Sequence, residues 1–460
     1  MASSTPRRAG GRRITESLRA QLWPVPSITI AFAIVIGIGL PILDEAIDDN
    51  LPAWLTVYLF QGGADASRAV LQAIAGSLIT VTALTFSLTV VTIQLASSQF
   101  SPRLLRTFTS DSVVHATLGL LLGTFVFSLT VLRTVRTGDD ERDVFIPLMS
   151  TTLAYVLAVA SVIGLVVFLA HLVRELRIET MLSTVHGETS AELERSFPDT
   201  PGAPAIVPTG GRSNEVLVDA AKSGFLLTVD EHSLLDLATT HSVVIRIDAL
   251  PGASLVRGVP LATFWPQEPG TEIAEDDLAE LRSSVAAAVS SGSERTIVQD
   301  AGFGLRQLID VAVKALSPGI NDPTTAVHTL GHAAALLCDL AARDLEPRLL
   351  RDERERVCVI VHRPTFAHYL DLVISQPRLY GISDPAVTAR LLRLLQEVAW
   401  NGEPPAVRAA VRDQLARMRE SMARQEWIEA DRSRLNALAA EVDDALEGRW
   451  RADAHAHGAD

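Results

Sequence analysis

Lysine and cysteine are scarce in this chain of 460 residues. Its 40 basic residues include two lysines, Lys222 and Lys314, and the formal net charge is −14. Nucleic-acid binding needs a basic surface, and the chain has no long basic run beyond its N-terminal segment, so we expect no nucleic-acid partner. The two cysteines, Cys338 and Cys358, lack the spacing of a zinc site, which predicts free thiols in a reducing compartment. We expect no metal and no cofactor.

Aromatic residues are also few, at 5%, whereas hydrophobic residues make up 48% of the chain. The excess lies in the first part of the sequence, where four apolar stretches each reach the length of about 20 residues that a membrane-crossing helix needs. These stretches cover residues 27–43, 70–96, 113–132 and 144–173. We therefore predict a membrane domain of four transmembrane helices over residues 27–173.

Arginines near the apolar stretches predict the orientation of this domain. The N-terminal segment 1–26 is basic, and Arg103 and Arg106 follow the second stretch, whereas the connection after the first stretch is rich in acids. We therefore expect a multi-pass protein of the cell inner (plasma) membrane with both termini in the cytoplasm. The lipid bilayer is its first expected partner, and Arg103 and Arg106 are expected to anchor the chain at the membrane surface.

The sequence after the fourth stretch changes character twice. Short runs such as "GFLLTV", "SVVIRID" and "VPLATFW" alternate with Gly/Pro turns, as is typical of strands, and the later segments carry apolar residues at helical spacing. We predict a polytopic α-helical membrane domain followed by a cytoplasmic α+β region. Its expected parts are a helical extension with a Pro/Gly linker (174–212), a small β barrel or sandwich (213–268), an α-rich domain (269–450) and a disordered tail (451–460).

The second apolar stretch contains the segment "TVTALTFSLTVVTIQLASSQFSPRLLR", in which threonine recurs. On a helix, one set of polar residues shares a narrow arc and a second set lies opposite. The first set is Thr82, Thr85, Thr89, Thr92 and Gln99, and the second is Ser77, Thr80, Ser87, Gln94 and Ser98. Three hypotheses remain open: the hydroxyls pack helices together, they line a water-filled path, or they bond to carbonyls of their own helix.

The candidate path-lining or helix-packing residues are Thr82, Thr85, Thr89, Thr92, Gln94 and Gln99. No Asp, Glu, Lys or Arg lies between Val70 and Gln99, so a pore built on this helix would select by size and dipoles.

A second pattern, "SPGINDP", begins at Ser317. Serine, proline and glycine are typical of a helix end, and Asn321 or Asp322 followed by proline is typical of a new helix start. The alternative hypothesis is a pocket for a small molecule or an ion, built on the amides of a helix N-terminus. Its candidate residues are Arg306, Ser317, Gly319, Asn321 and Asp322.

Two stretches together, "TVTALTFSLTVVTIQLASSQFSPRLLRTF" and "QDAGFGLRQLIDVAVKALSPGINDPTTAV", resemble a family of bacterial predicted membrane proteins of unknown function. The resemblance implies that one stretch in the membrane and one in the cytoplasm belong together in one kind of protein. It supplies no activity, cofactor or catalytic residue.

The leading functional hypothesis is an oligomeric channel or transport-like protein that is gated by its cytoplasmic domain. Four helices seldom enclose a path alone, so this hypothesis requires a homo-oligomer with the second span at its axis. The alternative is a non-transporting membrane sensor or scaffold. A membrane-bound enzyme comes third, because the sequence offers no nucleophile with a matching base, no carboxylate pair and no metal set.

Overall fold

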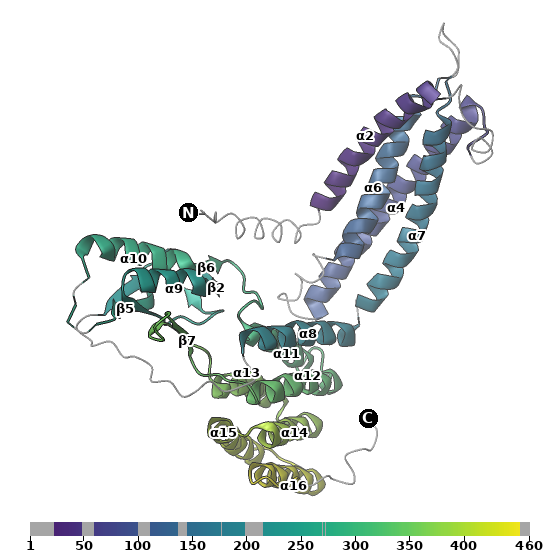
Figure 1. The fold of residues 1–460 in the computed structure, drawn as a ribbon. Helices are drawn as coiled ribbons and strands as arrows, with labels where there is room; N and C mark the ends of the chain where they lie inside the picture. The colour runs from purple at the N-terminus through teal and green to yellow at the C-terminus, as the bar shows by residue number, and fades with distance from the viewer. Residues whose placement is uncertain are drawn as a thin grey trace. The chain divides into compact units, whose positions relative to one another are not determined.

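The computed structural model describes residues 23–47, 59–99, 111–136, 145–175, 177–197, 215–268, 270–271 and 273–450. The chain divides into two compact units, Met1–Thr180 and Met181–Asp460. The first unit is helical, and the second combines β-sheets with helices (Figure 1).

Four helices of the first unit are long and apolar enough to cross a membrane, as the hydrophobic pattern predicts. They are α2 (Pro24–Ile47), α4 (Ala64–Gln99), α6 (Ser112–Leu132) and α7 (Leu148–Glu175). Helix α6 packs against each of the other three, and 56% of its apolar window is buried, compared with 17% for α7. Helix α6 is therefore the inner helix of this unit.

Small residues explain the close approach of α2 to α6. A Cβ atom added at Gly119 would lie 3.0 Å from Thr29 Oγ1, and one added at Gly123 would lie 2.9 Å from Thr29 Cγ2. Gly37 of α2 meets Thr130 of α6 in the same way, at 2.9 Å. Glycines four residues apart thus make room for a neighbouring helix, as is common in membrane helix pairs.

The second unit contains two sheets that share one hydrophobic core with helices α9 (Glu231–Thr240) and α10 (Glu275–Ala288). The five-stranded sheet has the order β1 (Val216–Asp219), β5 (Pro260–Pro266), β3 (Val243–Ile247), β8 (Val357–Val361), β7 (Arg348–Arg351). The three-stranded sheet has the order β4 (Ser254–Leu255), β2 (Gly224–Val229), β6 (Val289–Gly292).

These sheets correct the expected β barrel or sandwich confined to residues 213–268. Strand β8 pairs in parallel with β3, with Ile245 opposite Val359, so the sheet is completed by a strand more than a hundred residues later. The five-stranded sheet is open, because β1 and β7 each have one neighbour in it. A parallel pair needs a crossover connection, and a long-range pairing of this kind leaves no mark in the local sequence pattern.

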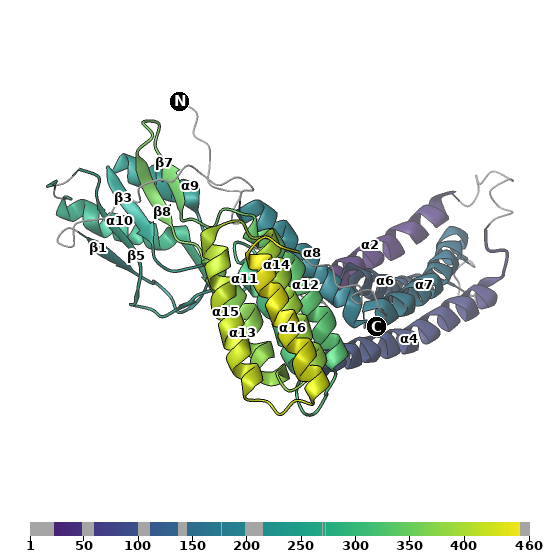
Figure 2. The same ribbon diagram turned by 90° about the horizontal axis from the view of Figure 1, so that it is seen from below.

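Six further helices form a helical group: α11 (Ala301–Ala315), α12 (Pro323–Ala341), α13 (Phe366–Gly381), α14 (Pro385–Asn401), α15 (Pro405–Ala423) and α16 (Glu429–Leu446). Helices α13 to α16 lie side by side (Figure 2). Helix α8 (Ile178–Ser196) joins this group, since it buries Met181, Leu182, Val185 and Leu193. The helical extension expected in 174–212 is therefore a packed helix of the second unit.

Candidate functional site

The threonine set of α4 faces the interior of the first unit. Thr82, Thr85, Thr89 and Thr92 are all buried, on the side where α4 packs against α6. Each hydroxyl donates a hydrogen bond to the carbonyl four residues earlier, at distances of 2.7 to 2.9 Å. The threonines thus combine two of the three hypotheses: they pack against a neighbour and satisfy their hydroxyls within their own helix.

The opposite polar set is exposed in the protomer. Ser77, Thr80, Ser87 and Gln94 all point away from the neighbouring helices. Ser77 and Thr80 donate to carbonyls of their own helix, at 3.0 and 3.3 Å. Of the six candidate residues named from the sequence, Gln94 is therefore the one whose described side chain reaches the outer surface of the unit.

Small residues continue this exposed face along α4. At alternating steps of four and three residues, the exposed positions are Ala69, Ala73, Gly76, Thr80, Ala83 and Ser87. We call this set the small-residue face. Large apolar side chains are exposed elsewhere on α4, for example Leu84 at 68%, and on α2 and α7, for example Phe32 at 63% and Val166 at 61% exposure.

Two predicted positions, and the side chain of a third, lie beyond the described part of the chain. Arg103 and Arg106, the expected membrane-surface anchors, fall outside the described residues, and so does the side chain of Gln99. Their roles stay predictions.

A buried carboxylate, one of the acids that follow the first apolar stretch, caps a neighbouring helix. Asp44 of α2 is 5% exposed, and its Oδ1 accepts a hydrogen bond from the Met149 amide at 3.0 Å. Its Oδ2 accepts from the Ser150 amide at 3.0 Å and from Ser150 Oγ at 2.6 Å. Asp44 therefore satisfies the first amides of α7, where the helix dipole also favours negative charge.

Further polar contacts join the helices of the first unit. Ser67 Oγ and Thr151 Oγ1 lie 2.8 Å apart, and Thr124 Oγ1 and Ser161 Oγ lie 3.2 Å apart. At the other end of α6 and α7, Asp111 caps α6 through the Val113 amide and lies 2.5 Å from His171 Nε2. The helical spacing of serine and threonine in the sequence could have indicated which side of each helix carries these hydroxyls. It could not have indicated which hydroxyls meet.

The structure separates the residues of the expected cytoplasmic pocket. Arg306 lies near the start of α11 and donates to Gln376 at 3.2 Å. Ser317 follows the end of the same helix, 11 residues later, which corresponds to about 16 Å along the axis. Arg306 therefore lies well apart from the "SPGINDP" turn along the helix axis, and a ligand pocket at the turn stays a prediction.

The "SPGINDP" turn itself has the geometry of a helix end and a helix start. Asp322 caps α12 by accepting from the Thr325 amide at 3.1 Å and from Thr325 Oγ1 at 2.6 Å. The Thr325 hydroxyl, followed by its amide, lowers the pKa of Asp322 below its ordinary value of 3.8. Asn321 takes a left-handed backbone with φ of 50°, and Gly319 is exposed. The predicted N-cap and first-turn proline are confirmed.

The start of the second motif, "QDAGFG", forms a junction between three elements. The Gln299 amide donates to Glu192 of α8 at 2.9 Å, and the Gln299 side chain pairs with both backbone groups of Val229 in β2, at 2.8 and 3.3 Å. Asp300 caps α11 through Phe303. The motif therefore holds α8, β2 and α11 together, a role that the local sequence gave no means to infer.

Two carboxylates are buried at this junction. Glu192 is 2% and Asp300 is 7% exposed. Burial raises the pKa of Asp300, although the Arg295 guanidinium, 2.7 Å away, acts in the opposite direction. Burial also raises the pKa of the Tyr369 phenol, beside Asp300. Among the described residues, no group of three or more His, Cys, Asp or Glu side chains is arranged to hold a metal ion.

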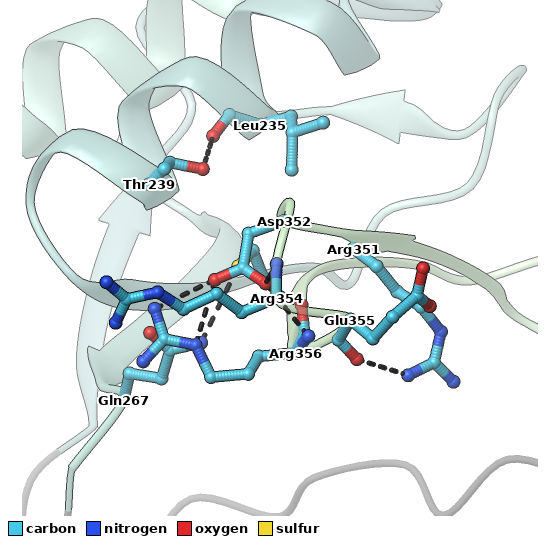
Figure 3. Close-up of polar contacts among 9 residues, drawn as sticks. Leu235, Thr239, Gln267, Arg351, Asp352, Arg354, Glu355 and Arg356 are labelled. Carbon is cyan, nitrogen blue, oxygen red and sulfur yellow. Dashed lines mark hydrogen bonds and ion pairs between the residues drawn. The ribbon is translucent and has the colours of Figure 1, made fainter.

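The charged turn between β7 and β8 is tied together by one aspartate (Figure 3). Asp352 accepts from the amides of Arg354 and Arg356 at 3.0 and 2.9 Å, and from Arg356 Nε at 2.8 Å. Arg351 donates to the Glu355 carbonyl at 2.8 Å. These contacts close a hairpin, so we assign this cluster to turn formation.

The model of a family described as "Predicted membrane protein (DUF2254)" matches residues 19–397, which include the four apolar helices and both motifs. The chain belongs to this family. Two relatives of this DUF2254 protein are the uncharacterized proteins Mb1321c of Mycobacterium bovis and Rv1290c of Mycobacterium tuberculosis. Each is 33% identical over 445 residues, which cover 95% of this chain and 82% of the relative. No solved structure matches the chain.

Proposed function

We propose that this protein forms a homo-oligomer in the cell inner (plasma) membrane, with both termini in the cytoplasm, and acts there as a channel or transport-like protein gated by its cytoplasmic unit. The observation that carries the proposal is the small-residue face of α4, which is exposed in the protomer. Small side chains let membrane helices approach closely, so a second copy of the chain is the natural neighbour for this face.

Polar groups along the same side of α4 supply what a path needs. Ser87 and Gln94 lie on the exposed side with Thr80, and hydroxyl and amide groups can replace part of the hydration shell of an ion or a small solute. The buried threonines are assigned to packing against α6, because their side chains lie inside the protomer. The proposed path therefore runs along the oligomer interface and not through the protomer.

The connection between the two units supports gating. Helix α7 ends at Glu175 and α8 begins at Ile178, so a joint of two residues links the last apolar helix to the second unit. Helix α8 is held firmly at its other end, because Arg343 and Arg363 donate to the carbonyls of Phe197 and Ser196 at 2.9 and 2.6 Å. A ligand that changes the second unit would therefore act on α7 through a short link.

Flux into proteoliposomes tests the proposal. We expect the purified protein to conduct small ions or solutes, and Ser87→Leu and Gln94→Leu to reduce that flux, because both remove polar groups from the proposed path. The matched control is Thr85→Val, which removes a buried hydroxyl at nearly constant volume and should leave flux unchanged.

Crosslinking separates assembly from conduction. A Ser87→Cys variant should form dimers with a short bis-maleimide in the membrane, whereas Val166→Cys on the outer surface of α7 should not. Crosslinked oligomers without flux of any tested ion would favour the non-transporting sensor or scaffold, which is also consistent with hydroxyls that bond to their own helix. If neither crosslinking nor flux is observed, the proposed α4 interface is contradicted together with the channel.

A further inference from the structure

Four large apolar side chains protrude from the helical group of the second unit. Ile320 in the α11–α12 turn is 43% exposed, Leu379 and Tyr380 in the last turn of α13 are 67% and 55% exposed, and Ile428 before α16 is 69% exposed. Exposed residues of this size are costly in water when they gather at one place.

Contacts between the helix ends place all four at the same end of the group. A Cβ atom added at Gly381 would lie 3.0 Å from Leu316, so α13 ends beside the end of α11. Arg378 donates to Ser421 Oγ at 2.8 Å, so α13 also ends beside the end of α15. The four side chains thus lie at one end of the group, which we call the apolar end.

Helix α8 begins at this same end. The rings of His186 in α8 and His332 in α12 lie 5.3 Å apart. A second contact lies 11 residues further along both segments, where Arg343 donates to the carbonyl of Phe197. The two helices therefore run in parallel. Along α8, the distance from His186 back to Ile178 is about 12 Å, and along α12 the distance from His332 back to Pro323 is about 14 Å. The first residues of the two helices therefore lie at the same level.

The chain ties this end to the bilayer. Ile178 lies three residues beyond Glu175, the end of a helix that is long and apolar enough to cross a membrane, and three residues reach at most about 10 Å. The other end of the group lies about 22 Å from the apolar end, because α14 starts beside the apolar end and carries Trp400 that far along its axis. There Trp400 packs against Trp450, with ring centroids 5.5 Å apart.

We propose that the apolar end binds the lipid surface of the membrane that the chain itself crosses. Leucine and isoleucine enter the boundary between headgroups and acyl chains, and tyrosine favours that depth because it is apolar with a polar tip. A flat partner suits a surface spread over the ends of several helices. The apolar end also gives the "SPGINDP" turn a second role, because it holds Ile320 outward while Asp322 caps α12.

Site-specific fluorescence on the full-length protein in proteoliposomes tests this binding. Single cysteines replace Tyr380, Ile428 or Trp400 and are labelled with a thiol-reactive nitrobenzoxadiazole dye, in vesicles with and without nitroxide-labelled lipid. Cys338 and Cys358, the two native free cysteines, are replaced by alanine beforehand, so that the dye labels the introduced cysteine. We expect blue-shifted emission that nitroxide lipid quenches at positions 380 and 428, and water-like, unquenched emission at position 400.

The outcomes decide between lipid, protein and water as neighbours of the apolar end. Unquenched, water-like emission at 380 and 428 would overturn the proposal. A blue shift without quenching would overturn it in favour of a second copy. A Leu379→Glu substitution added to the Ile428→Cys variant should abolish the quenching at 428, because a charge on the apolar end opposes insertion. None of these readouts depends on whether the oligomer conducts.

Discussion

Gly304 tests the docking of α8 against α11. It is buried in the first turns of α11, and a Cβ atom added there would lie 1.9 Å from Thr189 Oγ1 and 2.9 Å from Thr189 Cβ and Cγ2. The Thr189 hydroxyl cannot simply turn aside, because it donates to the Val185 carbonyl at 2.6 Å. Alanine at position 304 therefore forces the two helices apart.

Two effects of opposite sign compete in the Gly304→Ala variant. Alanine favours a helix over glycine by up to about 1 kcal/mol, whereas overpacking typically costs about 1 to 3 kcal/mol. The contact of 1.9 Å lies far below any real Cβ contact, so the steric cost should prevail. We expect the free energy of unfolding of the second unit to fall by about 1 to 2 kcal/mol.

Denaturant unfolding followed by tryptophan fluorescence measures this change. The matched control is Gly331→Ala in α12, where a Cβ atom meets nothing within 4 Å and alanine should stabilise. Adding Thr189→Ala to Gly304→Ala should recover part of the loss, since Oγ1 and Cγ2 are then removed. If Gly304→Ala proves as stabilising as Gly331→Ala, α8 does not pack on α11 as described.

Three further predictions concern helix ends. Asp44→Ala should lower the unfolding free energy of the membrane helices in detergent by about 2 to 4 kcal/mol, because two amides and a hydroxyl at the start of α7 lose their buried acceptor. The control Asp65→Ala, at an exposed position, should cost well under half as much. Asn321→Val should destabilise the second unit by about 1 to 2 kcal/mol and Asn321→Gly should not, because the left-handed φ of 50° penalises a branched side chain. Equal midpoints of denaturant unfolding for the two variants would disprove this strain. The pKa of Asp322 is depressed in the folded protein, so the unfolding free energy that Asp322 adds relative to Asp322→Ala should be complete above pH 3.8 and disappear as the pH falls further. A difference in unfolding free energy that is constant with pH would refute the cap.

Local chemistry made the helix ends predictable from the sequence. The proline, glycine and aspartate of "SPGINDP" predicted where α11 stops and α12 starts, because capping and backbone preferences act within a few residues. The four apolar helices were predictable for a similar reason, since membrane crossing requires continuous length and hydrophobicity.

Contacts between distant segments could not be predicted in this way. Strand β8 joins β3 across more than a hundred residues, and Asp44 meets Ser150 across 106 positions, and neither pairing has a periodic signature. For α4 the sequence revealed two polar arcs but not which arc would face α6, because both carry small hydroxylated residues. The structure shows that the arc with Thr85 and Thr89 is the buried one.

This difference between the arcs bears separately on the two parts of the proposed function, assembly and conduction. Hydroxyls on both faces of α4 bond to their own helix, as Thr89 does on the buried face and Thr80 on the exposed face, so neither set requires water or a partner. Side-chain size is more informative, since a lipid-facing helix gains nothing from Ala73 and Gly76 at close spacing, whereas a second helix gains close packing. The small-residue face therefore favours assembly, whereas Gln94 favours conduction, because its amide cannot be satisfied by a carbonyl of its own helix alone.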